Sequence, residues 1–413
     1  MGLKPGYKRT DVGVIPEDWN VSTVGREFEI KLGKMLDAEK NVGVPKPYIG
    51  NKAVQWDRID ISDLPTVPMS RTDIERFRLR KGDLLVCEGG EVGRAAIWEA
   101  PIEECYYQKA LHRLRPLRGF DSRLMVALLR QWSDRGLLAN YVTQTSIAHL
   151  PREKFVEVQM PIPTPAEQRA IAEALSDVDA LIGALDQLIT KKRDLKQAAM
   201  QQLLTGKPRL PGFRGEWEVK RLDELGAWKG RMTPSMQNPS YWHDGNVPWI
   251  SSGDVKSVLL KETGFSVTAS AVKQGTTTLL PANSIVVVTR SGILRKYLPV
   301  AMNVIPMAIN QDIKALIPNE KFCSTYLLHA LIGNGDRILA RCLKAGTTVE
   351  SIEFRWLKAF TIPLPPLPEQ TAIAEVLSDM DAELAALEQR RDKTRALKQG
   401  MMQELLTGRT RLV

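Results

Sequence analysis

Two stretches of the chain carry apolar residues at alternating spacings of four and three. The first set is Ile171, Leu175, Val178, Ile182, Leu185 and Ile189, and the second is Ile373, Leu377, Met380, Leu384 and Leu387. A mean spacing of 3.5 residues is typical of a coiled-coil seam. The pattern therefore predicts two long helices, over 164–206 and 366–408. A helix of about 40 residues is roughly 60 Å long at 1.5 Å per residue.

The flanking residues favour the same boundaries. Prolines precede each stretch, at 161, 163 and 165 and again between 363 and 368, and they cannot continue a helix inward. Gly206 and Gly408 follow Leu-Leu-Thr and suit the position just after a helix ends. We expect the two seams to pair antiparallel within the chain. The alternative is that each apolar stripe is buried against its own globular domain.

The helical stretches are copies of one another. Residues 167–210 and 369–412 align without a gap at an offset of 202, and 27 of their 44 positions are identical. Upstream the repeat is fainter: Trp19-x-Val21 matches Trp217-x-Val219, Ile49 matches Ile250, and Gln108 is paired with Gln311. A duplication of this kind indicates a domain–helix unit that occurs twice. Small insertions and deletions lie in the first part of each half.

The segments before the helices read as mixed α and β structure. Apolar runs at 83–87 and 284–288 follow turn-forming residues and predict strands, and 124–131 and 324–332 predict helices. The expected fold class is therefore α+β: two related domains joined by two long antiparallel coiled-coil helices, with a pseudo-twofold internal repeat. The expected order is a domain at 1–163, a helix at 164–206, a domain at 207–365 and a helix at 366–408.

Composition narrows the setting. The net charge of +9 and the pI near 9.3 are compatible with nucleic acid, although many enzymes are equally basic. No run of about 18 apolar residues predicts a membrane span, and the start MGLKPGYKRTDVG lacks the apolar core of a secretory signal. The four cysteines are scattered, which argues against a zinc site and a disulfide framework. We expect a cytoplasmic protein.

Catalytic motifs do not stand out. The sequence has no GxxxxGK[ST] phosphate loop, and Asn238-Pro239-Ser240 lacks the second proline and the aromatic residue of an adenine-methyltransferase motif. The four histidines have no Cys or carboxylate at metal-ligand spacing. The duplicated carboxylates of the helices suggest capping and pairing roles; they are Glu167, Asp177, Asp179, Glu369, Asp379 and Asp381. We expect no catalytic residue and no metal site in this chain.

Several motifs together resemble the specificity subunit of type I restriction–modification systems. They are the proline-led entries with Glu-Gln-x-x-Ile at 165–171 and 368–373, the helices that end in Leu-Leu-Thr-Gly, and the Trp-x-Val entries. Val247-Pro248-Trp249-Ile250-Ser251 and Asn310-Gln311-Asp312 also resemble this family's second recognition domain, whereas the first has Tyr107-Gln108-Lys109 instead. The resemblance covers essentially the whole chain.

The resemblance implies a function. Such subunits read a bipartite sequence in double-stranded DNA, with one target-recognition domain for each half-site. They recruit two adenine methyltransferase subunits and two motor–nuclease subunits. It implies no cofactor in this chain, and S-adenosylmethionine, ATP and Mg in the partner subunits. The chain itself is expected to be non-catalytic, within a complex that has site-specific adenine DNA methyltransferase and type I endonuclease activity.

Candidate DNA contacts are polar and basic residues placed on loops, because such side chains bind phosphates and base edges. In the first domain they are Lys34, Arg94, Gln108, Lys109, Gln144 and Thr145. In the second domain they are Lys229, Arg231, Arg290, Arg295, Lys296, Gln311 and Thr347. The matched glutamines and threonines could equally form scaffold hydrogen bonds shared by both domains.

Two rival functions remain open at this point. One is a fused methyltransferase or nuclease, which a methylation assay on the isolated chain would reveal. The other is a protein-interaction scaffold built on an internal coiled coil, without DNA binding. A footprint on random-sequence DNA separates that scaffold from a DNA-reading subunit.

Overall fold

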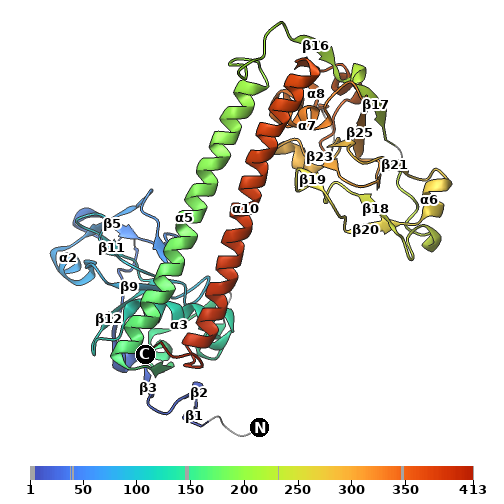
Figure 1. Ribbon diagram of the computed structural model, residues 1–413. Helices are drawn as coiled ribbons and strands as arrows, with labels where there is room; N and C mark the ends of the chain where they lie inside the picture. The colour runs from blue at the N-terminus through green and yellow to red at the C-terminus, as the bar shows by residue number, and fades with distance from the viewer. Residues whose placement is uncertain are drawn as a thin grey trace. The chain divides into compact units, whose positions relative to one another are not determined.

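The computed structural model describes residues 5–37, 39, 41–144, 148–230, 232–345 and 348–412. The chain divides into two compact units, one formed by 1–186 with 390–413 and the other by 187–389. Each of the two long helices, labelled α5 and α10 in Figure 1, begins in one unit and ends in the other. Each unit therefore combines one domain with a part of each helix. We call the globular parts domain 1, which precedes helix α5 (Pro165–Leu203), and domain 2, which lies in sequence between α5 and helix α10 (Leu367–Leu405).

The two long helices confirm the heptad prediction. Helix α5 spans Pro165–Leu203 and helix α10 spans Leu367–Leu405. Proline suits the first turn of α5, where its missing N–H would have no intrahelical partner. After the helices, Gly206 and Gly408 adopt φ values of +72° and +66°, a left-handed conformation that glycine tolerates at a helix end.

Ion pairs between the long helices repeat at the offset of 202. In the first unit, Lys398 Nζ lies 2.6 Å from Asp179 Oδ1. In the second unit, the equivalent pair is Lys196 with Asp381. A further pair, Arg395 with Asp186 at 2.9 Å, has its counterpart in Arg193 with Glu388. In each unit the first half of one helix lies beside the second half of the other, so the predicted antiparallel pairing is confirmed.

The first turns of each helix also pack on a domain. Ile171 and Leu175 share a buried cluster with Leu405 of α10 and with the apolar side chains of domain 1. In the second unit, Ile373 and Leu377 belong to the corresponding cluster with domain 2. Helix pairing and burial against the helix's own domain, considered above as alternatives, therefore both occur at these turns.

Domain 1 is built around two small sheets, with further two-stranded pairs and short helices beside them. The sheet orders are β10-β9-β12-β4 and β11-β5-β8. The helices are α1 (Val24–Glu27), α2 (Arg71–Phe77), α3 (Ser122–Asp134), η1 (Leu137–Tyr141) and α4 (Arg152–Phe155). The strands are β1 (Tyr7–Thr10), β2 (Gly13–Pro16), β3 (Asn20–Thr23), β4 (Phe28–Leu32), β5 (Val44–Ile49), β6 (Val54–Gln55), β7 (Arg58–Ile59), β8 (Thr66–Met69), β9 (Leu84–Cys87), β10 (Ala95–Ile97), β11 (Tyr106–Tyr107), β12 (Leu111–Pro116), β13 (Thr143–Gln144), β14 (Ala148–His149) and β15 (Gln159–Ile162).

Domain 2 repeats this plan. Its sheet orders are β17-β25-β22-β23-β19 and β20-β18-β24-β21. The helices are η2 (Leu222–Glu224), η3 (Pro239–Tyr241), α6 (Ala269–Lys273), η4 (Gly292–Arg295), α7 (Ser324–Gly333), α8 (Gly335–Cys342) and α9 (Phe354–Lys358). The strands are β16 (Glu218–Arg221), β17 (Gly226–Lys229), β18 (Val247–Ile250), β19 (Leu259–Leu260), β20 (Phe265–Val267), β21 (Thr278–Leu280), β22 (Ile285–Val288), β23 (Val300–Asn303), β24 (Met307–Ile309), β25 (Ile313–Pro318) and β26 (Thr361–Leu364). The strands expected near 83–87 and 284–288 are β9 and β22, and the expected helices are α3 and α7.

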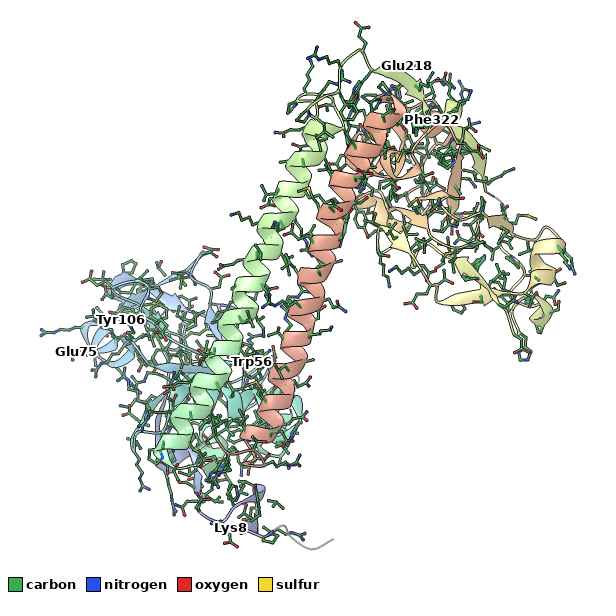
Figure 2. All side chains as sticks on the ribbon, in the orientation of Figure 1. Lys8, Trp56, Glu75, Tyr106, Glu218 and Phe322 are labelled. Atoms are coloured by element: carbon green, nitrogen blue, oxygen red, sulfur yellow. The ribbon has the colours of Figure 1, made fainter. Side chains whose placement is uncertain are left out.

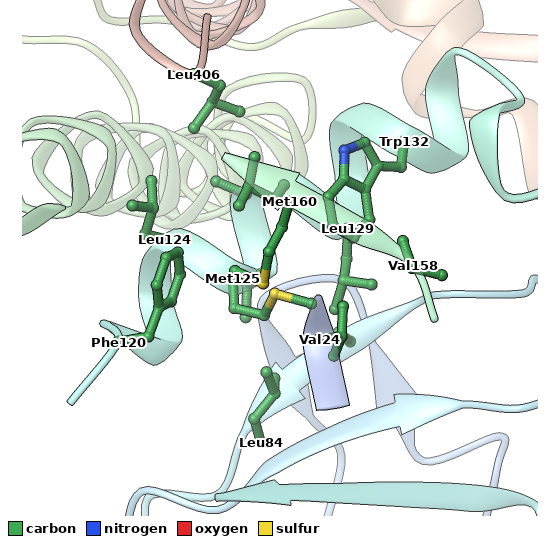
Figure 3. Packing of buried hydrophobic residues seen from close by; sticks show 14 of the residues in the cluster. Val24, Leu84, Phe120, Leu124, Met125, Leu129, Trp132, Val158, Met160 and Leu406 are labelled. Atoms are coloured by element: carbon green, nitrogen blue, oxygen red, sulfur yellow. The ribbon is translucent and has the colours of Figure 1, made fainter. Parts of the chain in front are cut away.

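The cores explain why these short elements hold together. Helix α3 buries one face against the first sheet of domain 1, where Leu124, Met125 and Leu129 belong to the same buried cluster as Leu84 of β9 (Figure 3). A separate apolar cluster fills the second sheet of the domain and includes the buried Tyr106 (Figure 2). Domain 2 likewise has one core beside the helices and further clusters among its sheets. Each domain can therefore present loops at its sheets while its other side is packed on the long helices.

Candidate nucleic-acid interface

A buried glutamate ties each domain to the helix that follows it. In the first unit, Trp19 Nε1 donates to Glu167 Oε2 at 2.7 Å, and Arg411 Nη2 donates to the same oxygen at 2.8 Å. The Arg411 guanidinium also lies over the Trp19 ring. Glu167 is 0% exposed, so its charge depends on these partners. The ion pair raises the pKa of Arg411 above its usual value.

The second unit contains the same arrangement. Trp217 Nε1 donates to Glu369 Oε2 at 3.1 Å, and Arg209 Nε donates to Glu369 Oε1 at 2.9 Å. Arg209 lies over the Trp217 ring, as its counterpart does in the first unit. We call the two sets of Trp, Glu and Arg the clasps. Their glutamates have the pairing role expected from the duplication.

The neighbouring glutamines hold the start of each helix. Gln168 Nε2 donates to the carbonyl of Pro163 at 2.9 Å, and its Oε1 accepts the backbone N–H of Asp121 at 3.1 Å. Gln370 forms the equivalent bonds to the Pro365 carbonyl and the Cys323 N–H, at 2.8 and 3.0 Å. The Glu-Gln motif is thus structural: it joins the entry of each long helix to a short helix of its domain.

Several candidate DNA contacts in domain 1 already have partners inside the chain. Lys34 Nζ lies 2.8 Å from Asp73 Oδ2, and the Lys34 side chain is only 16% exposed. Arg94 Nη2 donates to the carbonyl of Asn51 at 3.0 Å, and Nη1 lies 3.2 Å from Glu91. These two cations stabilise loops of the domain. Their assignment to DNA stays a prediction.

The structure brings Lys34, Gln108 and Lys109 together. Lys34 forms a backbone bridge with Gln108, and the Lys109 N–H donates to the Lys34 carbonyl at 2.8 Å. The Lys109 side chain is exposed. Gln144 ends strand β13, and Thr145 lies outside the described residues.

The sequence pairing of Gln108 with Gln311 is wrong by one residue. The Gln108 N–H donates to the carbonyl of Ile49, and the equivalent bond in domain 2 runs from Asn310 to Ile250. Strand register agrees, because Tyr107 pairs with Ile49 and Ile309 pairs with Ile250. Gln108 therefore corresponds to Asn310, and Lys109 corresponds to Gln311. The identity of the two glutamines suggested a match that the backbone does not follow.

In domain 2, a basic cavity brings Arg290 and Gln311 together. It has a volume of about 550 Å³, and its other lining residues include Lys314 of β25 and Lys344. Arg290 and Gln311 are exposed, and Lys314 is half-buried. Burial lowers the pKa of Lys314, while Asp312 acts in the opposite direction. An electropositive concave surface of this kind suits an anionic ligand.

Three further candidates of domain 2, Lys229, Arg295 and Lys296, are not among the residues that line this cavity. Arg295 pairs with Glu350, and the hydrogen bond from Arg295 lowers the pKa of that carboxyl. Lys296 and Lys229 are exposed. Arg231 and Thr347 lie outside the described residues.

Sequence reasoning missed two lysines of the cavity, Lys314 and Lys344. Lys314 sits in an otherwise apolar strand, Ile-Lys-Ala-Leu-Ile, and that interruption was the available signal. Lys344 had no such signal, because it is one of many lysines in loops. No group of three or more His, Cys, Asp or Glu able to hold a metal ion occurs among the described residues. Nor does any helix in the described part of the chain have the length and hydropathy to cross a membrane.

Comparison with known families gives a decisive match. The profile described as "Type I restriction modification DNA specificity domain" matches residues 16–192 and again 214–395. The chain belongs to this family. The two matches coincide with the two halves of the internal duplication, and together they cover most of the chain.

Individual members of the specificity family are similar to this chain over different lengths. The specificity subunit of the Escherichia coli type I restriction enzyme EcoR124I/EcoR124II is 36% identical over 234 residues, which are 55% of this chain and 56% of that subunit. The chain thus spans about half the length of that relative. The MjaVIII specificity subunit of Methanocaldococcus jannaschii is 23% identical over an alignment covering 96% of this chain and 94% of that subunit.

The fold is also shared with a solved structure. The type I restriction–modification S subunit from M. genitalium superposes with a TM-score of 0.61 and 16% identity. The match covers 98% of this chain and 99% of that structure. The fold of two α+β domains with two long helices is therefore that of an S subunit.

Proposed function

We propose that this chain is the sequence-reading subunit of a type I restriction–modification complex, and that each domain reads one half of a bipartite DNA target. The observation that carries the proposal is the contrast between the clasps, which repeat residue for residue, and the loop surfaces, which do not. Identical frames suit two copies of the same partner subunit. Different surfaces suit two different half-sites.

The partners of this chain follow from the same proposal. Two adenine methyltransferase subunits, which use S-adenosylmethionine, and two motor–nuclease subunits, which use ATP and Mg, supply the chemistry. The chain itself binds DNA in the cytoplasm and holds these subunits. The duplicated helix carboxylates Glu167, Asp179, Glu369 and Asp381 are engaged in ion pairs with basic residues of the same unit, which supports a structural role for them and not a catalytic one.

Selection from random-sequence duplex DNA tests the reading function. The full chain, with methyltransferase subunits present, is expected to enrich two short conserved blocks separated by a gap of constant length and variable sequence. Mapping of methylated adenines in the native host should return the same two blocks. Enrichment of no sequence at all would instead favour a protein-interaction scaffold.

An assay of the isolated chain tests the absence of catalysis. The purified chain is incubated with duplex DNA and radiolabelled S-adenosylmethionine, and in parallel with ATP and Mg. We expect neither methyl transfer nor cleavage above a no-protein control. Robust turnover without partner subunits would contradict the proposed role and favour a fused enzyme.

A further inference from the structure

Lys314 occupies an unusual position in the basic cavity of domain 2. Its side chain is half-buried, yet its only hydrogen bond in the described chain is a long one, 3.4 Å, from Nζ to the carbonyl of Gln311. No salt bridge to it occurs among the described residues. Gly230 leaves room for it, because a Cβ at that glycine would lie 2.5 Å from Lys314 Cδ. The described residues thus leave the ammonium group without an ion pair: Asp312 acts on it only as a nearby charge, and its Nζ lies 5.9 Å from the centre of the Phe354 ring.

The neighbouring cations leave the cavity positive. Lys344 Nζ lies 3.2 Å from Glu353 Oε2, so the charges of these two lining residues offset each other. Arg290, on the same wall, is exposed and forms a backbone bridge with Ser351. Arg290 and Lys314 therefore contribute two positive charges that the cavity's own carboxylate does not offset.

Domain 1 has different residues at the positions equivalent to Lys314 and Arg290. Strand register shows that His112 of domain 1 is equivalent to Lys314 of domain 2. His112 pairs with Val86 of β9, and Lys314 pairs with Val287, which holds the same position in β22. His112 is 0% exposed, and its Nε2 lies 2.8 Å from the carbonyl of Leu150. Gly89 takes the place of Arg290, since each forms the same backbone bridge. Domain 1 therefore has no cation at either of these two positions.

We infer that the cavity of domain 2 binds a backbone phosphate of the DNA through Lys314 and Arg290, and that domain 1 has no equivalent contact. A phosphate carries a full negative charge, which suits two unneutralised cations in one concave site, whereas base edges offer only partial charges. A lysine ammonium is a compact point charge that fits a recessed position. This inference rests on the proposed DNA-reading function and adds an anchoring site to one half of it.

Salt dependence of binding by the full chain provides the test. The probe is a labelled duplex that carries the selected target, and its affinity is measured from about 50 to 300 mM salt. Replacement of Lys314 by Met keeps most of the side-chain volume but removes the charge. Removal of one phosphate contact should reduce the slope of log K against log salt by about 0.9, and weaken binding about eightfold at 0.1 M salt. The exposed Lys321, outside the cavity lining, gives the matched control Lys321→Met.

A second arm changes the DNA instead of the protein. Neutral methylphosphonates are placed one at a time along the half-site that domain 2 reads. One position should weaken the wild-type complex but have no further effect on Lys314→Met, while the selected base sequence stays the same. That pattern would support the phosphate site even if the variant were less stable.

Other results would overturn the inference. A Lys314→Met variant with an unchanged slope and an unchanged methylphosphonate profile would place the cavity outside the interface. An unchanged slope with a new preferred base would make Lys314 a base-reading residue. If the wild-type chain showed no salt-sensitive DNA binding, the proposed function would fail and this inference with it.

Discussion

The clasps and the positions of Lys314 and Arg290 in the cavity both have counterparts in the other half of the chain, yet the two regions have diverged to different extents. Each clasp keeps its Trp, Glu and Arg, whereas His112 and Gly89 stand where domain 2 has Lys314 and Arg290. A clasp glutamate is buried, so loss of its arginine leaves an uncompensated charge, and loss of its tryptophan removes a hydrogen bond to that charge. The side chains of Arg290 and Lys314 are exposed or partly exposed, and they carry no such internal constraint. We propose that the frame is constrained by its own internal partners and the reading surface by the ligand.

The largest change we expect concerns the gap between the half-sites, which we propose the long helices determine. Insertion of one heptad after Leu185 and another after Leu387 keeps the apolar seam and lengthens each helix by about 10 Å. The preferred gap should grow by about three base pairs, because DNA rises 3.4 Å per base pair. Selection from a random library measures it, and the half-site sequences should not change.

Weak binding by the insertion variant would be understandable, since three base pairs rotate the second half-site by about 100° around the duplex. The sequence preference of the complexes that do form is therefore the informative quantity. An unchanged gap with altered half-sites would show that the helices do not determine the spacing. Insertion into only one helix serves as the control, because it disturbs the repeated ion pairs without lengthening both helices.

The next largest effect should come from breaking a clasp. Glu167→Ala and Glu369→Ala each leave an arginine and a tryptophan N–H without their shared acceptor. Each should lower the free energy of unfolding of its own unit by about 2–4 kcal/mol, less than for a fully buried pair because the arginines are partly exposed. Urea denaturation followed by circular dichroism measures the loss. The exposed Glu375→Ala is the control and should change stability by less than about 0.5 kcal/mol. Unequal losses at the two sites would mean that the clasps are not equivalent.

A smaller effect is expected at the surface of domain 2. Combined replacement of Arg290, Arg295 and Lys296 by Ala should reduce the salt slope by about one unit for each phosphate that the variant no longer binds. Removal of a hydrogen bond to a base edge should cost about 1–3 kcal/mol at one position only. Arg290→Ala alone should weaken binding more than Arg295→Ala, because Arg295 is paired with Glu350. If the triple variant kept the affinity and the salt dependence of the wild-type chain, these three residues would lie outside the DNA interface.

The last prediction distinguishes the two units by the pH dependence of their stability. Burial lowers the pKa of His329 to about 4, while Asp381 raises it and Lys196 lowers it further. Below a pH of about 6.5 the unfolded chain binds a proton that the folded chain does not. Stability is therefore lost as pH falls from about 6.5 to 4, by up to about 1.4 kcal/mol per pH unit.

The histidine prediction has a simple variant. His329→Leu should flatten the pH dependence of unfolding in the second unit, measured as urea midpoints at pH 7, 6 and 5. His112, whose pKa is also lowered to about 4 by burial, should keep the first unit acid-sensitive in that variant. An identical pH slope before and after the substitution would show that His329 titrates as it does in the unfolded chain.

Much of the frame could be predicted from the sequence, and much less of the interface. The helices and the clasp residues lie in segments that align without gaps, so one copy checks the other. Around Gln108 the alignment rested on a single shared residue type, and it slipped by one position. Hydrogen bonds of the backbone, not side-chain identity, decide which residues are equivalent there.

By itself, the sequence determined the duplication, the two long helices and their ends, because heptad spacing, prolines and glycines act locally along the chain. Only the tertiary structure decided which cations remain available to a ligand. Lys34, Arg94 and Arg295 bond to partners 39, 43 and 55 residues away, and no local pattern announces such contacts. Among the described residues Lys314 forms no salt bridge, and only the fold places it beside Gly230 and the Phe354 ring. Charge can be counted in a sequence, but its neutralisation depends on which distant segments the fold brings together.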